Sequence, residues 1–89
     1  MTKFAFILMM YGTTPMVPTA YVVEHTGLTG EECITLLVEK SKKDPYNEAG
    51  DPYCTIDTFG EPITIIPVDG GMLFYSGGTY THQATEQSQ

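Results

Sequence analysis

The first apolar run of the chain, Phe4–Tyr11, contains no polar position other than its closing tyrosine. Its periodicity therefore does not separate a buried strand from a short buried helix. The next run opens with Pro18, whose fixed φ suits a first helical position, and closes at Gly27, a residue typical of helix C-termini. This pattern predicts a two-turn helix over residues 18–25.

A longer helix is predicted over residues 30–43. Thr29 and Glu32 have the spacing of a capping box, in which each side chain bonds the backbone of the other residue. Pro45 prevents the helix from continuing. Apolar positions on this helix predict an inward face made of Cys33, Ile34, Leu37 and Val38. Three lysines near its end suit the negative pole of the helix dipole: Lys40, Lys42 and Lys43.

The C-terminal half has the alternation and turn signals of β-structure. Residues 53–58 alternate modestly, and residues 63–68 are rich in β-branched side chains, although Pro67 favours an edge or a bulge there. Asp69-Gly70-Gly71 is a turn signal that leads into a third apolar run, residues 72–75. These segments predict a three-stranded antiparallel meander.

Taken together, the pattern predicts a small α+β domain over residues 1–78, followed by a polar, disordered tail over residues 79–89. The domain is expected to consist of a helix-turn-helix-like pair followed by the three-stranded meander, which is a winged-helix-like arrangement. Because a chain of this size is marginally stable alone, a homodimer is a further option. We expect it to bury either Phe4–Tyr11 or Ile63–Val68 between two copies.

Charge limits the classes of partner. The 89 residues include 11 acidic side chains and 4 lysines, with no arginine, which gives a formal net charge of −7. Since cations supply most of the affinity for phosphates, this balance argues against a generic nucleic-acid binder. The longest apolar run is also roughly half of the length that crosses a membrane. We therefore expect no membrane contact and a cytoplasmic location.

The cysteines and histidines are candidate ligands without a ligand pattern. Cys33 and Cys54 could pair, but two cysteines are few for a disulfide framework, so we expect free thiols in a reducing cytoplasm. Zinc would need His25 and His82 as further ligands, with every gap at eight residues or more, whereas structural zinc sites use close pairs. No metal and no cofactor are expected.

No catalytic constellation is apparent, and we expect a protein that is not an enzyme. The adjacent acids Glu31 and Glu32 point to different sides of a helix and make no acid–base pair. No glycine-rich phosphate loop with a following lysine is present in the sequence.

The remaining class is a small acidic binding protein that regulates or inhibits a nucleic-acid-handling complex. Its partner would be a basic, nucleic-acid-binding protein, because an acidic field steers a chain toward basic surfaces. Tyrosine is enriched at protein interfaces, so tyrosines beside the acids are included. The predicted partner-binding residues are Glu31, Glu32, Glu39, Asp44, Glu48, Asp51, Tyr46 and Tyr53.

Residues 4–35 resemble the opening of the pyocin activator family of phage-related regulators. The resemblance rests on Phe6-Ile7-Leu8-Met9-Met10-Tyr11-Gly12, on Val17-Pro18, and on Leu28-Thr29 followed by Glu31-Glu32. It implies a helix for the first apolar run, a helix-turn-helix fold and a phage-type transcriptional regulator that binds DNA directly. That function is the alternative, and the acids at the start of the second helix favour a protein partner over DNA.

Overall fold

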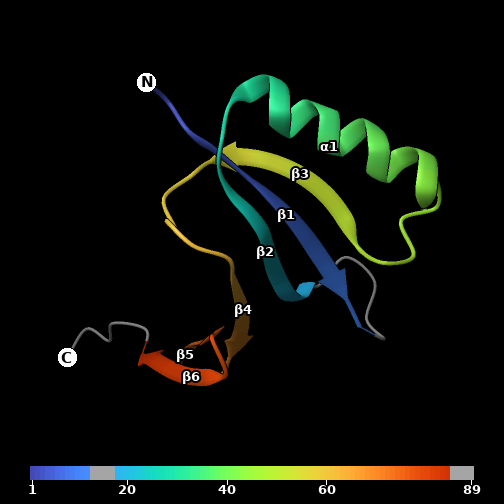
Figure 1. Cartoon of the computed structure of the whole chain (residues 1–89). Coiled ribbons are helices and arrows are strands. Elements are labelled where there is room, and N and C mark those ends of the chain that lie inside the picture. The colour runs from blue at the N-terminus through green and yellow to red at the C-terminus, as the bar shows by residue number, and fades with distance from the viewer. Residues whose placement is uncertain (13–17, 85–89) are drawn as a thin grey trace.

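The computed structural model describes residues 1–12 and 18–84, which form one antiparallel sheet and one helix (Figure 1). The elements in chain order are β1 (Phe4–Tyr11), β2 (Pro18–Leu28), α1 (Gly30–Lys43), β3 (Asp51–Ile56), β4 (Ile63–Val68), β5 (Gly71–Ser76) and β6 (Thr79–Ala84). The six strands lie in the order β3-β1-β2-β4-β5-β6. The predicted fold, a helix-turn-helix pair followed by three strands, is therefore wrong.

The segment predicted as the first helix of that pair is strand β2. It pairs antiparallel with β1 along most of its length, so the helix that the family resemblance implies for residues 4–11 is also wrong. The sequence Tyr21-Val22-Val23 is aromatic and β-branched, which favours a pleated surface, and β1 supplies a matching apolar partner. Tertiary pairing outweighed the helix-start and helix-stop signals of Pro18 and Gly27. Val17, which the resemblance also used, lies outside the described residues.

The strand order places β3 away from the meander to which it was assigned. β3 pairs with β1 at one edge of the sheet, and the three-stranded meander is instead β4–β5–β6. In β4, only Ile63–Ile65 pair with β2, and the rest of the strand has β5 as its single neighbour among the described strands. Pro67 lies in this second part, where its missing N–H breaks no bond to β2. The expectation that Pro67 marks a local edge is confirmed.

Two further expectations need correction. Residues 79–84, predicted as part of a disordered tail, form strand β6, which pairs with β5 in continuous register. Residues 85–89 of that tail lie outside the described residues. β1 and β4, the strands expected to be buried between two copies, each have neighbours on both sides. The true edges of the sheet are β3 and β6.

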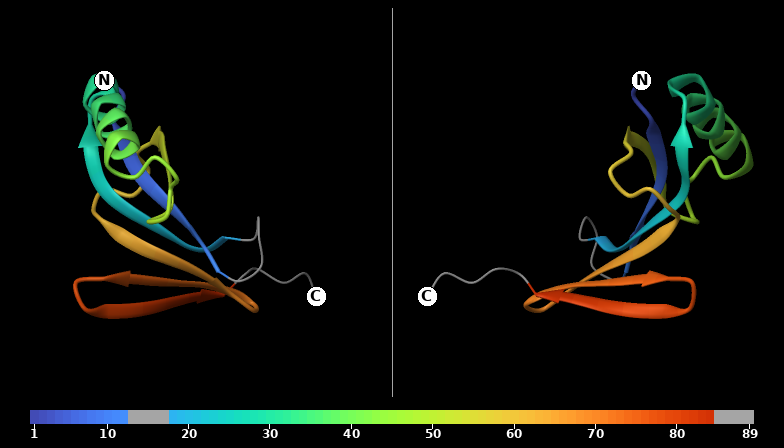
Figure 2. Two further views of the ribbon diagram at one scale, coloured as in Figure 1. Left: turned by 90° about the vertical axis from the view of Figure 1, so that its right-hand side faces the viewer. Right: turned by 60° about the vertical axis from the view of Figure 1, so that its left-hand side comes forward.

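The sheet has an apolar cluster on each face. Helix α1 covers β1, β2 and β3 on one face, where Phe6, Leu8 and Cys33 are buried. The other face buries Ala5, Ile7 and Val23 beneath partly buried side chains that include Tyr53 and Phe59. Figure 2 shows that the sheet twists so strongly that the β5–β6 hairpin runs across the direction of β1 and β2. The hairpin contacts no described strand or helix other than β4.

Asp57 holds the loop that carries Phe59 over the second cluster. Its carboxylate accepts backbone N–H bonds from Phe59 and Gly60 at 2.9 and 3.0 Å, and from Gly27 at 2.8 Å. These bonds, with Gly60 first, lower the pKa of Asp57. One side chain thus ties the β3–β4 loop to the end of β2.

Candidate functional site

Helix α1 begins and ends as the sequence predicts. Thr29 Oγ1 accepts a bond from the Glu32 backbone N–H at 3.1 Å, and Glu32 Oε1 accepts one from the Thr29 N–H at 2.8 Å, so the capping box is confirmed. The three lysines lie in the last turn. Glu32, predicted as a partner contact, therefore has a structural use as well.

The helix is rotated relative to the predicted inward face. Cys33, Leu36 and Leu37 contact the sheet, whereas Ile34 and Val38 keep 59% and 47% of their surface exposed. The apolar arc of α1 is wider than the strip that the sheet covers, and Cys33 lies at the centre of that strip. The prediction that Ile34 and Val38 point inward is wrong.

Ile34 and Val38 belong to an exposed surface that we call the outer helix face. At 100° per residue, six exposed side chains fall on the side of α1 opposite Cys33. They are Glu31, Ile34, Thr35, Val38, Glu39 and Lys42. The outer helix face therefore presents two apolar side chains one turn apart, with Glu31 before them and Glu39 and Lys42 after them.

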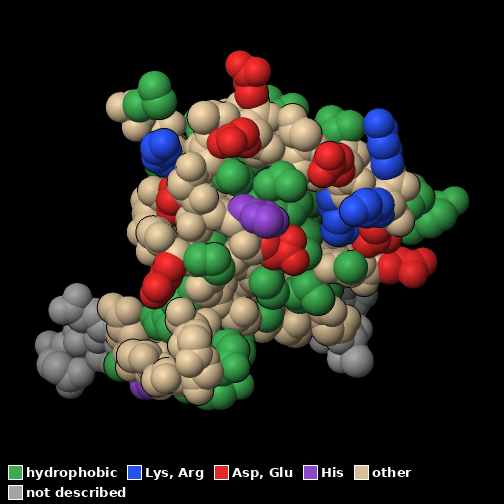
Figure 3. Space-filling view, in the orientation of Figure 1, with side chains coloured by type: hydrophobic (Ala, Val, Ile, Leu, Met, Phe, Trp, Pro, Cys, Tyr) green, Lys and Arg blue, Asp and Glu red, His purple; other side chains and the backbone are tan. Residues whose placement is uncertain are grey.

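The acids predicted as one contact surface are divided among several places. Glu39 lies at the border of the outer helix face, where it also lines a hollow of about 150 Å³ with Lys40, Lys43 and His25. In the view of Figure 3, acidic and lysine side chains lie next to one another over the C-terminal half of α1. The helix thus carries mixed charge and not a continuous acidic field.

Asp44 is used within the fold. It follows the last residue of α1, and its carboxylate pairs with Lys40 Nζ at 2.8 Å and accepts N–H bonds from Glu48 at 2.9 Å and Ala49 at 2.7 Å. The hydrogen bond from Lys40, followed by the two backbone bonds, lowers the pKa of Asp44 to about 2. A partner that contacted this carboxylate would compete with three existing bonds.

The remaining predicted residues lie on different sides of the molecule. Tyr46 and Glu48 are exposed in the α1–β3 loop, and Tyr46 keeps 84% of its surface. Asp51 starts β3. Burial, followed by the charge of Asp51, raises the pKa of Tyr11. Tyr53 packs beside Ala5 and Ile7 on the face opposite α1. One flat partner surface cannot contact Tyr53 and the outer helix face together.

A β-bulge marks a surface that sequence reasoning missed. Ile7 is opposite Val23 and Phe6 is opposite His25, so Glu24 is the extra residue between them. Pairing of β2 with β4 also ends at Val23. Beyond that point an open groove of about 400 Å³ separates β2 from the β4–β5 strands. Its lining residues include Glu24, His25, Thr64 and Tyr75.

The groove and the α1 hollow share Glu24 and His25. His25 also lies against Phe6, with ring centroids 6.1 Å apart. No pattern in the sequence signals this arrangement, because a bulge depends on the register between two strands.

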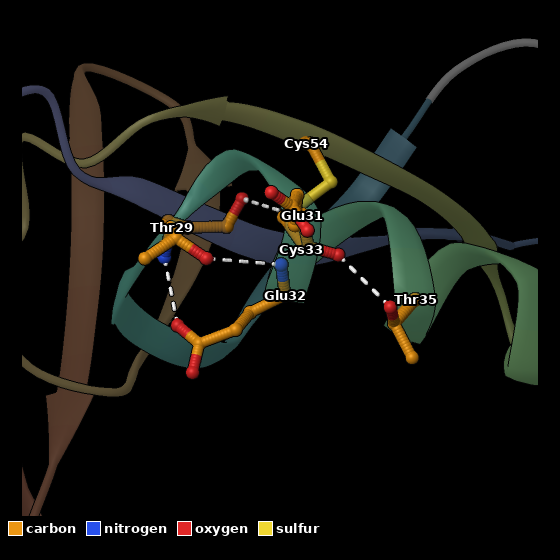
Figure 4. The surroundings of a disulfide bond; sticks show 7 residues. Thr29, Glu31, Glu32, Cys33, Thr35 and Cys54 are labelled. Carbon is orange, nitrogen blue, oxygen red and sulfur yellow. Dashed lines mark hydrogen bonds between the residues drawn. A yellow bond between two sulfur atoms is a disulfide. The ribbon is translucent and has the colours of Figure 1, made fainter.

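The cysteines form a disulfide, so the expectation of free thiols is wrong. Cys33 on α1 and Cys54 on β3 are joined with a sulfur–sulfur distance of 2.04 Å and a Cα–Cα distance of 6.2 Å (Figure 4). β3 lies beneath the helix because it pairs with β1, and this pairing brings Cys54 to Cys33. Within residues 1–12 and 18–84, no three metal-ligating side chains gather at one place.

The part of the chain that the structure describes contains no helix long and apolar enough to cross a membrane. No protein-family model matches the chain, and neither the curated proteins nor the solved structures contain a significant match. The resemblance of residues 4–35 to the pyocin activator family therefore stays a prediction from those residues alone.

Proposed function

We propose that this chain is a non-enzymatic binding protein whose outer helix face docks on a basic protein, and that it regulates or inhibits a nucleic-acid-handling complex in this way. The observation that carries the proposal is the exposure of Ile34 and Val38 on a helix whose first turn is acidic. An apolar pair one turn apart offers a small desolvated centre, and Glu31 beside it favours a cationic rim on the partner.

A nucleic-acid-handling partner follows from charge. With a net charge of −7, the chain is repelled by nucleic acid and attracted to the basic surfaces of the proteins that bind it. The alternative function, a DNA-binding regulator, lacks its expected helix-turn-helix because residues 18–28 form a strand. Proteins that handle nucleic acid are found in the cytoplasm, where protein thiols are normally reduced. Partner binding is therefore to be measured with the Cys33–Cys54 disulfide both intact and reduced.

The test is capture of host proteins on the immobilised full chain, with and without nuclease. We expect a nuclease-resistant partner whose capture falls roughly five- to thirty-fold in the Glu31→Lys and Ile34→Glu variants, the range for losing about 1–2 kcal/mol at an interface centre. The matched control is Glu61→Lys, which makes the same charge change at an exposed loop position away from α1.

If Glu31→Lys and Glu61→Lys capture the partner equally, the net charge of the chain alone explains binding, and the proposal for the outer helix face is contradicted. Recovery of one recurring DNA sequence, lost on nuclease treatment, would favour the regulator instead. Far-UV circular dichroism on every variant checks that the fold is kept.

A further inference from the structure

Strand β6 is an open sheet edge without the usual protection. All six of its residues are exposed, and β5 is its only neighbour among the strands of the described residues. Protected edges carry charges, prolines or bulges that discourage pairing with another chain. β6 reads Thr-Tyr-Thr-His-Gln-Ala and pairs with β5 without a register shift. By contrast, the β3 edge begins with Asp51 and Pro52.

The hairpin geometry shows which backbone groups face outward. Gly77 and Gly78 have φ of 59° and 84°, which is the conformation of a two-residue type I′ turn closed by Ser76 and Thr79. Backbone groups then alternate along β6, with those of Thr79, Thr81 and Gln83 directed to β5. The N–H and C=O of Tyr80 and His82 consequently lie on the open edge.

The hairpin is incompletely covered on both faces. On one face the Tyr75 and Tyr80 rings pack in a tilted arrangement with centroids 4.7 Å apart, although 38% and 62% of their surfaces stay exposed. On the other face Met72 and Phe74 line an open hollow of about 250 Å³ with Gln83 and Ala84. A hairpin with so little packing gains stability from a further strand.

The charge distribution indicates which kind of partner can pair with the β6 edge. None of the 4 lysines and 11 acidic residues of the chain lies within residues 71–84. Two copies of the chain, each with a net charge of −7, repel one another least where this hairpin, which has no acid or lysine, meets the same hairpin of the other copy. A basic partner gains nothing here, because the acids lie elsewhere.

We propose that β6 pairs antiparallel with β6 of a second copy across a two-fold axis, which joins two six-stranded sheets into one continuous sheet. Such an interface is self-complementary, since the same outward groups of Tyr80 and His82 serve both copies. The hairpin shares no residue with the outer helix face, so the dimer does not depend on the proposed function. Glu31→Lys is accordingly expected to leave the dimer unchanged.

Sedimentation velocity over a wide concentration range tests the pairing. We expect the full chain, 9.8 kDa as a monomer, to reach twice that mass. His82→Pro removes one outward N–H and should raise the dissociation constant at least tenfold, while the thermal melt of a dilute monomeric sample stays close to that of the parent chain. A parent chain that remains monomeric at the highest concentration overturns the proposal.

A second variant keeps the test decisive if His82→Pro disturbs the hairpin. Thr81→Lys places a charge from each copy close to the two-fold axis, and Thr58→Lys makes the same change on an exposed loop. Weaker dimerisation by Thr81→Lys alone supports β6 pairing. A dimer that tolerates Thr81→Lys as well as it tolerates Thr58→Lys overturns the proposal, as does one weakened by Ile34→Glu and not by Thr81→Lys.

Discussion

Asp44 illustrates how a residue selected for its charge is used by the fold. Its side chain closes the end of α1 by pairing with Lys40, and it also holds the turn that leads to β3 through the N–H groups of Glu48 and Ala49. Lys40 in turn donates to the backbone carbonyl of Gly50 at 3.2 Å. The carboxylate is therefore a junction between helix and loop more than a free acid.

Asp44→Asn is expected to lower the melting temperature at neutral pH, because the neutral amide replaces the charged acceptor of these bonds. The pKa of Asp44 in the folded protein, about 2, lies below its ordinary value of 3.8. The charged form thus stabilises the fold fully above about pH 5, and this contribution is lost as the pH falls toward 2. Thermal melts of Asp44→Asn and of the parent chain, recorded from neutral pH down to pH 2, should show a progressively smaller difference in melting temperature.

Glu48→Gln is the control, since none of residues 1–12 and 18–84 bonds the Glu48 carboxylate and that side chain is exposed. If the melting temperatures of Asp44→Asn and the parent chain differ as much at pH 2 as at pH 7, this account of the Asp44 charge is contradicted.

At the scale of elements, local signals were sufficient for α1 and insufficient for its surroundings. The Thr29–Glu32 box and Pro45 fix the ends of the helix through contacts between residues close in sequence, and the strand at residues 63–68 is marked by its β-branched run. The rotation of α1 is set by the position of the sheet, which the sequence pattern does not contain. Ile34 and Val38 were consequently placed in the core.

The strand β2 and the disulfide were missed for a related reason. Tyr21-Val22-Val23 is compatible with a strand, but only the presence of β1 beside it decides against a helix. Likewise, the 21-residue separation of Cys33 and Cys54 gives no sign that β3 runs under α1. Part of the candidate site was predicted: Glu31 lies on an exposed face of α1, whereas Tyr53 belongs to the opposite face of the sheet.

The disulfide is expected to stabilise the attachment of α1 to β3. Closing a loop of this length in the unfolded chain contributes about 3 kcal/mol. Cys33→Ser with Cys54→Ser should therefore lower the free energy of unfolding by about that amount, measured by urea denaturation. The parent chain without reductant should react with a thiol reagent only after denaturation and reduction. Equal stability of the two proteins would contradict this expectation.

At the scale of the whole molecule, coverage by the helix and the positions of charged side chains divide the sheet into the same two parts. The β3–β1–β2 half carries the helix and the disulfide, whereas β5 and β6 lack both a helix and a charged side chain. The uncharged segment can be read from the sequence, but the coverage by the helix could not be predicted, because it depends on β3 joining the far side of β1. It places the two proposed interaction surfaces on separate parts of the molecule.

The position of β1 has a consequence for amide hydrogen exchange. β1 is flanked by β2 and β3 and lies beneath α1, so its amides open only when most of the fold opens. Among the described elements, the β5–β6 hairpin is attached to the sheet through β4 alone, and it can open locally. In dilute protein, mass-spectrometric exchange should therefore be slowest in β1 and fastest in β6, and similar rates in both would contradict this order. As the protein is concentrated, protection should rise in β6, leaving β1 unchanged.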